Sequence, residues 1–233
     1  QITLSDPGLE CRFTTQPALQ MTSLYNNYSG TEMLRDPALA HLFLVEVDGR
    51  RYGAEDFTVE VVSANEDARG FVASLLLPEH TLRATLEVGL AETGQLTMYL
   101  ALANAGEAPL TFKTAFPHLG GLAVSTEPAN DYYMFPAWGG IIASENTLLR
   151  TSYGEETAWW QMIDLYSPAR GAGMALRSLD DTGLYKCPTL RKGISLNPDY
   201  VMTQIGRHMQ PEMYWQSALE PGDGASMAFE YLR

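Results

Sequence analysis

The chain has 233 residues, of which 45% are hydrophobic and 18% charged, and its formal net charge is −13. A surface this acidic repels phosphate groups, so nucleic acid and an anionic membrane surface are not expected as partners. No apolar run is long enough to span a bilayer, and the length suits one domain over residues 1–233.

Apolar and polar residues alternate over much of the chain, as is typical of strands with one buried face. This pattern predicts strands at residues 9–14, 18–24, 57–62, 82–88, 95–102 and 110–116, and the apolar run at 71–77 also has the length of a strand. Turn residues such as Asp48-Gly49 separate the predicted strands.

Helical signals are sparse. One short turn is predicted over 29–37, ended by Pro37, and a loop or short helix is predicted over 146–156. Many short strands at roughly ten-residue spacing therefore predict an all-β sandwich or barrel.

Aromatic residues gather in the second half of the chain. Residues 131–140 carry four aromatic rings with a proline and two glycines, and a second group follows at 159–166. Flat rings on such loops suit the apolar faces of sugars, but they also suit a sandwich core. On a strand, Trp159 and Trp160 would point to opposite faces, so that one ring faces outward. The candidate sugar-binding residues are Trp138, Trp159, Trp160, Tyr133, His118, Gln161 and Asp164.

Signatures of catalysis and metal binding are missing from the sequence. There is no Gly-x-Ser-x-Gly segment and no zinc or calcium spacing, and no catalytic residue, metal or cofactor is predicted. The acidic pairs Glu155-Glu156 and Asp180-Asp181 are interpreted as solvated loop residues. No carboxylate pair for glycoside hydrolysis can be selected from the 28 acidic residues. Cys11 and Cys187 are interpreted as independent thiols in preference to a disulfide.

Four segments in a fixed order carry a family resemblance: Phe116–Leu119, Asp131–Gly140, Trp160–Tyr166 and Gly171–Asp181. In this order they resemble the N-terminal β-supersandwich of a bacterial glycoside-hydrolase-like family of unassigned function. That family is related to the endo-α-N-acetylgalactosaminidases and, more distantly, to galactose mutarotase. The resemblance implies a galactose-mutarotase-like supersandwich of two large, mostly antiparallel sheets. It also implies a C-terminal (β/α)₈ catalytic domain as partner, so the chain by itself is not expected to hydrolyse glycosides.

Three functions are therefore open. The leading hypothesis is a non-catalytic carbohydrate-associated domain that binds a neutral glycan or supports a catalytic domain. The second is an aldose 1-epimerase with His118 or His208 as the acid, although the residue pattern of true mutarotases around these histidines is not matched. The third is a purely structural or protein-interaction sandwich with buried tryptophans. The compartment is not determined, and a secreted or periplasmic location is one expectation.

Overall fold

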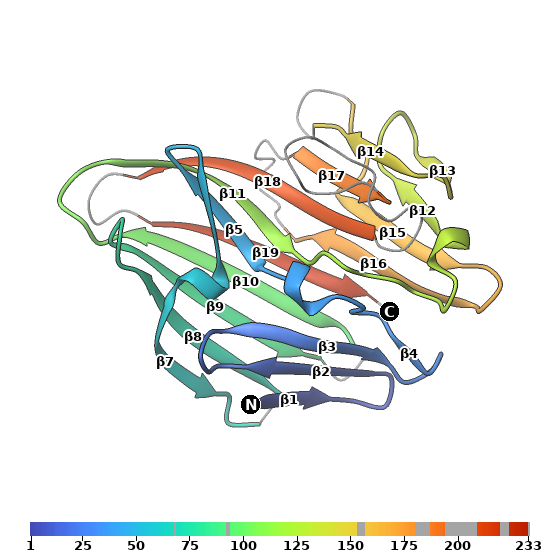
Figure 1. Cartoon of the computed structure of the whole chain (residues 1–233), viewed down its shortest axis with the longest axis horizontal. Helices are drawn as coiled ribbons and strands as arrows, with labels where there is room; N and C mark the ends of the chain where they lie inside the picture. The colour runs from blue at the N-terminus through green and yellow to red at the C-terminus, as the bar shows by residue number, and fades with distance from the viewer. Residues whose placement is uncertain are drawn as a thin grey trace.

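The computed structural model describes residues 1–67, 69–91, 94–152, 157–179, 187–193, 209–219 and 224–232. For Cys187 and the last two ranges it describes the backbone only. In this part of the chain the fold is almost entirely antiparallel β-structure, arranged in three sheets (Figure 1).

The largest sheet has nine strands in the order β13-β12-β15-β16-β19-β10-β9-β8-β7. In that order the strands are Ile141–Ala143, Tyr132–Phe135, Met162–Ser167, Ala172–Ser178, Gly224–Leu232, Leu96–Asn104, Leu82–Leu90, Gly70–Leu77 and Thr58–Ala64.

Two smaller sheets complete the architecture. The six-stranded sheet has the order β14-β17-β18-β11-β5-β6, with strands Thr147–Arg150, Cys187–Lys192, Met209–Leu219, Leu110–His118, Leu42–Val47 and Arg50–Gly53. The four-stranded sheet has the order β1-β2-β3-β4, with strands Ile2–Ser5, Leu9–Thr14, Gln20–Asn26 and Thr31–Glu32. Three short 3₁₀ helices are η1 (Pro37–Leu39), η2 (Ala54–Asp56) and η3 (Pro128–Asn130).

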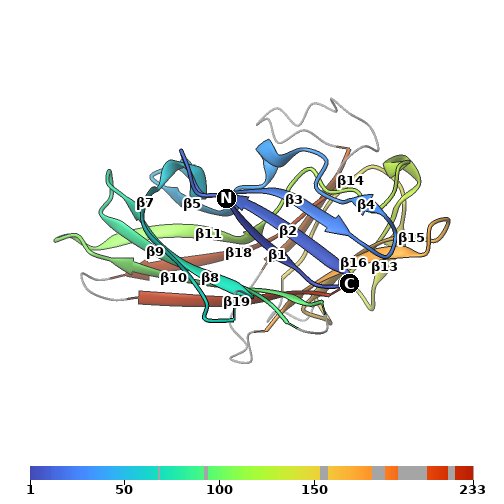
Figure 2. The same ribbon diagram turned by 90° about the horizontal axis from the view of Figure 1, so that it is seen from below.

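The sheets pack in layers around one hydrophobic core. Strands β11 and β18 lie above β10 and β19 in Figure 2. Strand β10 alternates strictly between buried and half-buried residues, as expected for a strand with one face against a core. The rings of Phe13 on β2 and Phe71 on β8 meet edge to face, with centroids 5.0 Å apart, so the four-stranded sheet packs against the nine-stranded one.

Most of the predicted strands are confirmed, and two local predictions are wrong. Pro37 begins the short helix η1 where a turn ending at Pro37 was expected, because its fixed φ suits the first helical position. Residues 147–150 form strand β14, where a loop or helix was expected, and they pair with β17, a partner from about forty residues further along the chain. Local sequence carries little information about such a partner.

The core contact between Phe13 and Phe71 yields a stability prediction. Phe71→Ala removes a fully buried ring and leaves a cavity, so we expect it to lower the free energy of unfolding by about 3–5 kcal/mol. Urea denaturation measures the change. Val61→Ala on neighbouring β7 is the control, because Val61 is exposed and the expected change is within about 0.5 kcal/mol. Equal effects of the two substitutions would contradict the packing described.

Candidate functional site

Three tryptophans are exposed together at one end of the nine-stranded sheet. Trp138 is 75% exposed, Trp159 60% and Trp160 45%, which is unusual for the largest apolar side chain. Trp138 begins the turn Trp138-Gly139-Gly140 between β12 and β13, and the other two lie just before β15. We call these three rings, with Gly139 and Gly140, the tryptophan surface.

Backbone hydrogen bonds hold the two loops of the tryptophan surface against each other. The Trp138 amide donates to the Thr157 carbonyl at 3.1 Å, and the Trp159 amide donates to the Pro136 carbonyl at 3.0 Å. An isolated β-bridge joins Ala137 to Ala158 between them. The loops therefore carry their rings on a fixed frame, although both lie outside the long strands.

The two glycines let the tryptophan rings lie directly on the backbone. All three residues of the turn have positive φ, with values of 53° at Trp138, 86° at Gly139 and 106° at Gly140. A β-carbon on Gly140 would lie 2.9 Å from Cζ3 of Trp160, and one on Gly139 would lie 3.4 Å from Cζ3 of Trp159. A side chain at Gly140 would therefore displace the Trp160 ring.

The tryptophan pair corrects one expectation from the sequence. We expected Trp159 and Trp160 to point to opposite faces of a strand, with one in the core. Neither residue is in a strand, because β15 begins only at Met162, so the alternation rule does not apply and both rings are exposed. Buried tryptophans, which the structural-sandwich hypothesis requires, are not found at these positions.

Two further predicted sugar contacts, Tyr133 and Asp164, lie on opposite faces of the nine-stranded sheet. Tyr133 is only 2% exposed and lies in the core. This corrects the prediction that Tyr133 contacts a sugar, because a buried ring cannot reach a ligand. Its neighbour Tyr132 faces outward and stacks on Tyr166, with centroids 5.7 Å apart. Gln161 is half-buried beside Trp160, and its carbonyl accepts a hydrogen bond from the Ser178 amide.

Asp164 lies half-buried on β15, on the outward face of the sheet. It is paired in register with Met134 on β12 and with Ala175 on β16. Burial raises the pKa of the Asp164 carboxyl, and a hydrogen bond involving the Leu165 backbone opposes this only in part. A hydroxyl group that donates a hydrogen bond to this carboxyl would stabilise its charged form.

His118 belongs to a different part of the molecule. It ends β11, is 1% exposed, and its ring lies 5.1 Å from that of His41. Nδ1 of His41 contacts the carboxylate of Glu55 on η2. Burial opposes ionisation of Glu55, but the His41 hydrogen bond, the Glu55 backbone and nearby His118 together hold its pKa below the usual value.

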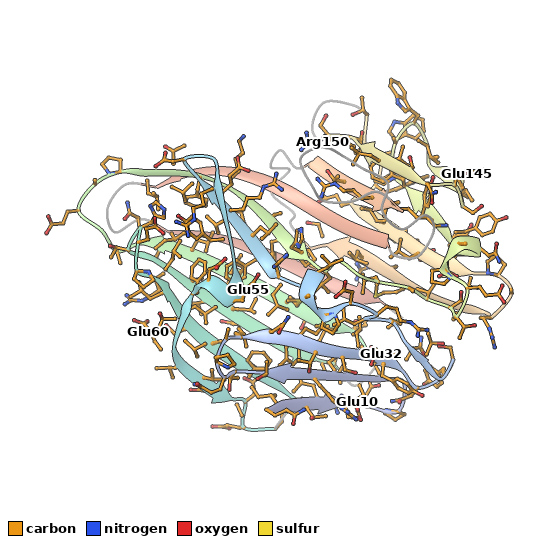
Figure 3. The ribbon with its side chains drawn as sticks, in the orientation of Figure 1. Glu10, Glu32, Glu55, Glu60, Glu145 and Arg150 are labelled. Atoms are coloured by element: carbon orange, nitrogen blue, oxygen red, sulfur yellow. The ribbon has the colours of Figure 1, made fainter. Side chains whose placement is uncertain are left out.

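In Figure 3, Glu55 of the histidine cluster is labelled well apart from Glu145 and Arg150. Glu55 lies near the middle of the molecule, whereas Glu145 and Arg150, which border the tryptophan loops in sequence, lie at its upper right end. His118 is also three strands away from Arg150 in the six-stranded sheet. The structure thus brings together Trp138, Trp159 and Trp160 but does not bring His118 to them.

Sequence reasoning missed two features. His41 and Glu55 are far from His118 in sequence, and no local pattern marks their meeting. The fully buried Lys192 was also missed. Its ammonium donates to the carbonyls of Ala129, Asp131 and Ser144, and burial lowers the pKa of Lys192. A single lysine in a β-strand gives no sequence signal for such a role.

Several predictions fall outside the described residues: His208, the pairs Glu155-Glu156 and Asp180-Asp181, and the side chain of Cys187. Cys11 is a free thiol, and burial strongly raises its pKa. Within the described ranges, no three histidine, cysteine or acidic side chains gather so that they could hold a metal ion. In the same part of the chain, no helix has the length and apolar character to cross a membrane.

No protein-family model and no curated protein matches the chain. Solved structures do match over nearly its whole length. A galactose mutarotase related enzyme from Lactobacillus acidophilus aligns with a TM-score of 0.63 at 11% identity, covering 98% of this chain and 95% of that one. A galactose mutarotase-like protein from Lactobacillus casei gives 0.62 at 12% identity, covering 99% and 98%.

A third match is a domain of a larger enzyme. The GH36 α-galactosidase from Geobacillus stearothermophilus aligns with a TM-score of 0.61 at 10% identity, covering 99% of this chain and 40% of that one. At such low identity these matches show the fold alone: the chain has a galactose mutarotase-like β-sandwich fold, as predicted. The proposed relation to endo-α-N-acetylgalactosaminidases stays a prediction.

The turn at Gly140 gives a prediction with a matched control. Gly140→Ala strains the backbone at positive φ, which we expect to cost about 1–3 kcal/mol, and it pushes the Trp160 ring away. Denaturation measures the first effect, and a changed tryptophan emission spectrum reports the second. Gly49→Ala has comparable φ but open space around the new β-carbon, so it should cost stability without changing the emission. An unchanged spectrum for Gly140→Ala would count against the contact with Trp160.

Proposed function

We propose that this chain is a carbohydrate-associated domain that binds a neutral glycan at the tryptophan surface without catalysing a reaction there. The observation that carries the proposal is the joint exposure of Trp138, Trp159 and Trp160 on loops fixed by backbone hydrogen bonds. The three exposed indole rings form a large apolar area in contact with water. A contiguous apolar area of this kind is typical of a binding surface.

The fixed loops of the tryptophan surface favour a ligand with a small, rigid apolar face. Because the loops are already ordered, little conformational freedom is lost on binding. The apolar face of a pyranose ring is flat enough to pack on an indole, while its hydroxyls remain free for polar groups such as Gln161 and Asp164. With a net charge of −13, a neutral sugar is preferred over an acidic one.

A second partner fits the same surface. The chain covers 40% of the length of the GH36 α-galactosidase it resembles, and the resemblance found in the sequence implies a (β/α)₈ catalytic domain as neighbour. In that case the tryptophan surface would pack against the neighbouring domain, and the chain would support catalysis without holding sugar. Sugar binding by the chain by itself distinguishes the two roles.

Calorimetric titration with a panel of neutral oligosaccharides tests the proposal. We expect Trp138→Ala and Trp159→Ala each to weaken binding at least tenfold, equivalent to about 1.4 kcal/mol. Tyr28→Ala is the matched control, because Tyr28 is an equally exposed ring in the turn between β3 and β4 and should leave binding unchanged. If no member of the panel binds, the glycan-binding role is wrong and the supporting role remains.

The histidine cluster supports a second candidate, an aldose 1-epimerase. That reaction needs a base for the proton of the anomeric hydroxyl and an acid for the ring oxygen. Glu55, with its lowered pKa, suits the base, and the half-exposed His41 suits the acid. His118, one of the two histidines to which the sequence-based hypothesis gave the acid role, is buried against His41 and would position it without touching a sugar.

Polarimetry of freshly dissolved galactose or glucose tests this candidate. We expect the chain to speed the change in rotation, and Glu55→Gln to lower the enzymatic rate roughly 100-fold or more. His80→Ala is the control, since His80 hydrogen-bonds to Tyr52 and does not belong to the cluster. A rate for the unmodified chain equal to that of buffer removes the candidate.

A further inference from the structure

We infer that the tryptophan surface continues into a second sugar subsite on the outward face of β15 and β16, so that the glycan bound is an oligosaccharide chain. The inference rests on the proposed function and extends it from a surface for one sugar ring to a surface for several.

A shallow hollow of about 580 Å³ lies on this outward face. Asp164 and Tyr166 on β15 and Gly173 and Ala175 on β16 line it, together with the turn that joins the two strands. Tyr166 is paired in register with Gly173, and Asp164 with Ala175. The hollow exists because each large side chain faces a small one across the strands. Its volume lies within the roughly 300–1,000 Å³ typical of small-molecule sites.

Met134 lies between the tryptophan surface and the strand that carries Asp164. A β-carbon on Gly140 would lie 2.9 Å from the Trp160 ring and 3.8 Å from the sulfur of Met134, so these two side chains border the same point. Met134 is in turn the register partner of Asp164 on the adjacent strand, roughly 4.8 Å away. The step from Trp160 to the hollow therefore crosses one strand, at the apolar side chain of Met134.

The lining of the hollow has the chemistry that a sugar unit requires. The Tyr166 ring offers an apolar wall, and stacking on Tyr132 at an interplanar angle of 26° fixes its orientation. The Asp164 carboxyl offers acceptor oxygens for hydroxyl groups. Burial raises the pKa of this half-buried carboxyl, and a hydrogen bond donated by a sugar hydroxyl would stabilise its charged form.

Charge determines which kind of polymer the tryptophan surface and the hollow together would bind. A carboxylate in the hollow and a net charge of −13 both repel uronic acid or sulfated chains. A peptide would bring backbone amides that need partners there, whereas the side chains at Met134 and Ala175 offer none. A neutral oligosaccharide matches the apolar rings and the acceptor oxygens of Asp164, and the negative charge of the protein does not repel it.

The experiment compares sugar length with occupancy of the hollow. Neutral gluco- and galacto-oligosaccharides of one to six units are titrated into the unmodified chain, Ala175→Phe, and the control Ala101→Phe. Ala175→Phe fills the hollow from its half-exposed floor. Ala101→Phe places the same ring on the outward face of β10 in the same sheet, at a half-buried position outside the lining. Thermal denaturation establishes that each variant is folded.

We expect the affinity of the unmodified chain and of Ala101→Phe to rise about tenfold or more from the shortest bound sugar to the longer ones. Ala175→Phe should keep the affinity for the shortest sugar and lose the gain with length. Asp164→Leu, which removes the acceptor without filling the hollow, should lose part of the same gain and serves if Ala175→Phe does not fold.

The outcomes separate this inference from the proposed function. If Ala175→Phe and Asp164→Leu both keep the full gain with length, the second subsite is wrong, while the tryptophan surface stands. If Trp138→Ala leaves all binding unchanged, or no sugar binds at any length, the proposed function fails and the extension fails with it. An affinity that does not rise with length in the unmodified chain also overturns the second subsite.

Discussion

The packing of the inner face of the nine-stranded sheet against the two smaller sheets is the interaction on which the rest of the structure depends. Because side chains on a strand alternate between faces, burying one set fixes where the other set lies. On β12 the core takes Tyr133 and Phe135, which leaves Tyr132 and Met134 outside. On β15 the core takes Ile163 and Leu165, and the outward face carries a different chemistry as a result.

Buried polar contacts reinforce this order around β12 and β13. The Lys192 ammonium joins three carbonyls from the start of β12, from η3 and from the turn after β13. The Asp131 carboxylate accepts hydrogen bonds from the amide of Val124 and the hydroxyl of Ser125. A buried charge must have such partners, so these segments are held in one arrangement. The loop that carries Trp138 follows β12, which begins directly after Asp131.

The fold places two chemically distinct groups in different regions. The histidine cluster lies where β11 ends beside β5, and His41 contacts Glu55 directly. The tryptophan surface lies at the end of the nine-stranded sheet and offers the exposed apolar area of three indole rings. Binding through dispersion requires exposed apolar area, whereas acid–base chemistry requires groups with perturbed pKa values. The fold provides these two environments in separate places.

The sequence by itself determined the alternating strands between residues 9 and 116 and the concentration of rings near residues 131–166, because these depend on neighbours one or two positions apart. It also identified Trp138, Trp159 and Trp160 as candidates. Only the tertiary structure decided that both Trp159 and Trp160 face outward, that Tyr133 is buried, and that His118 meets His41. Those outcomes depend on hydrogen bonds and strand pairings between distant segments, and a period-two pattern holds no information about which segments meet.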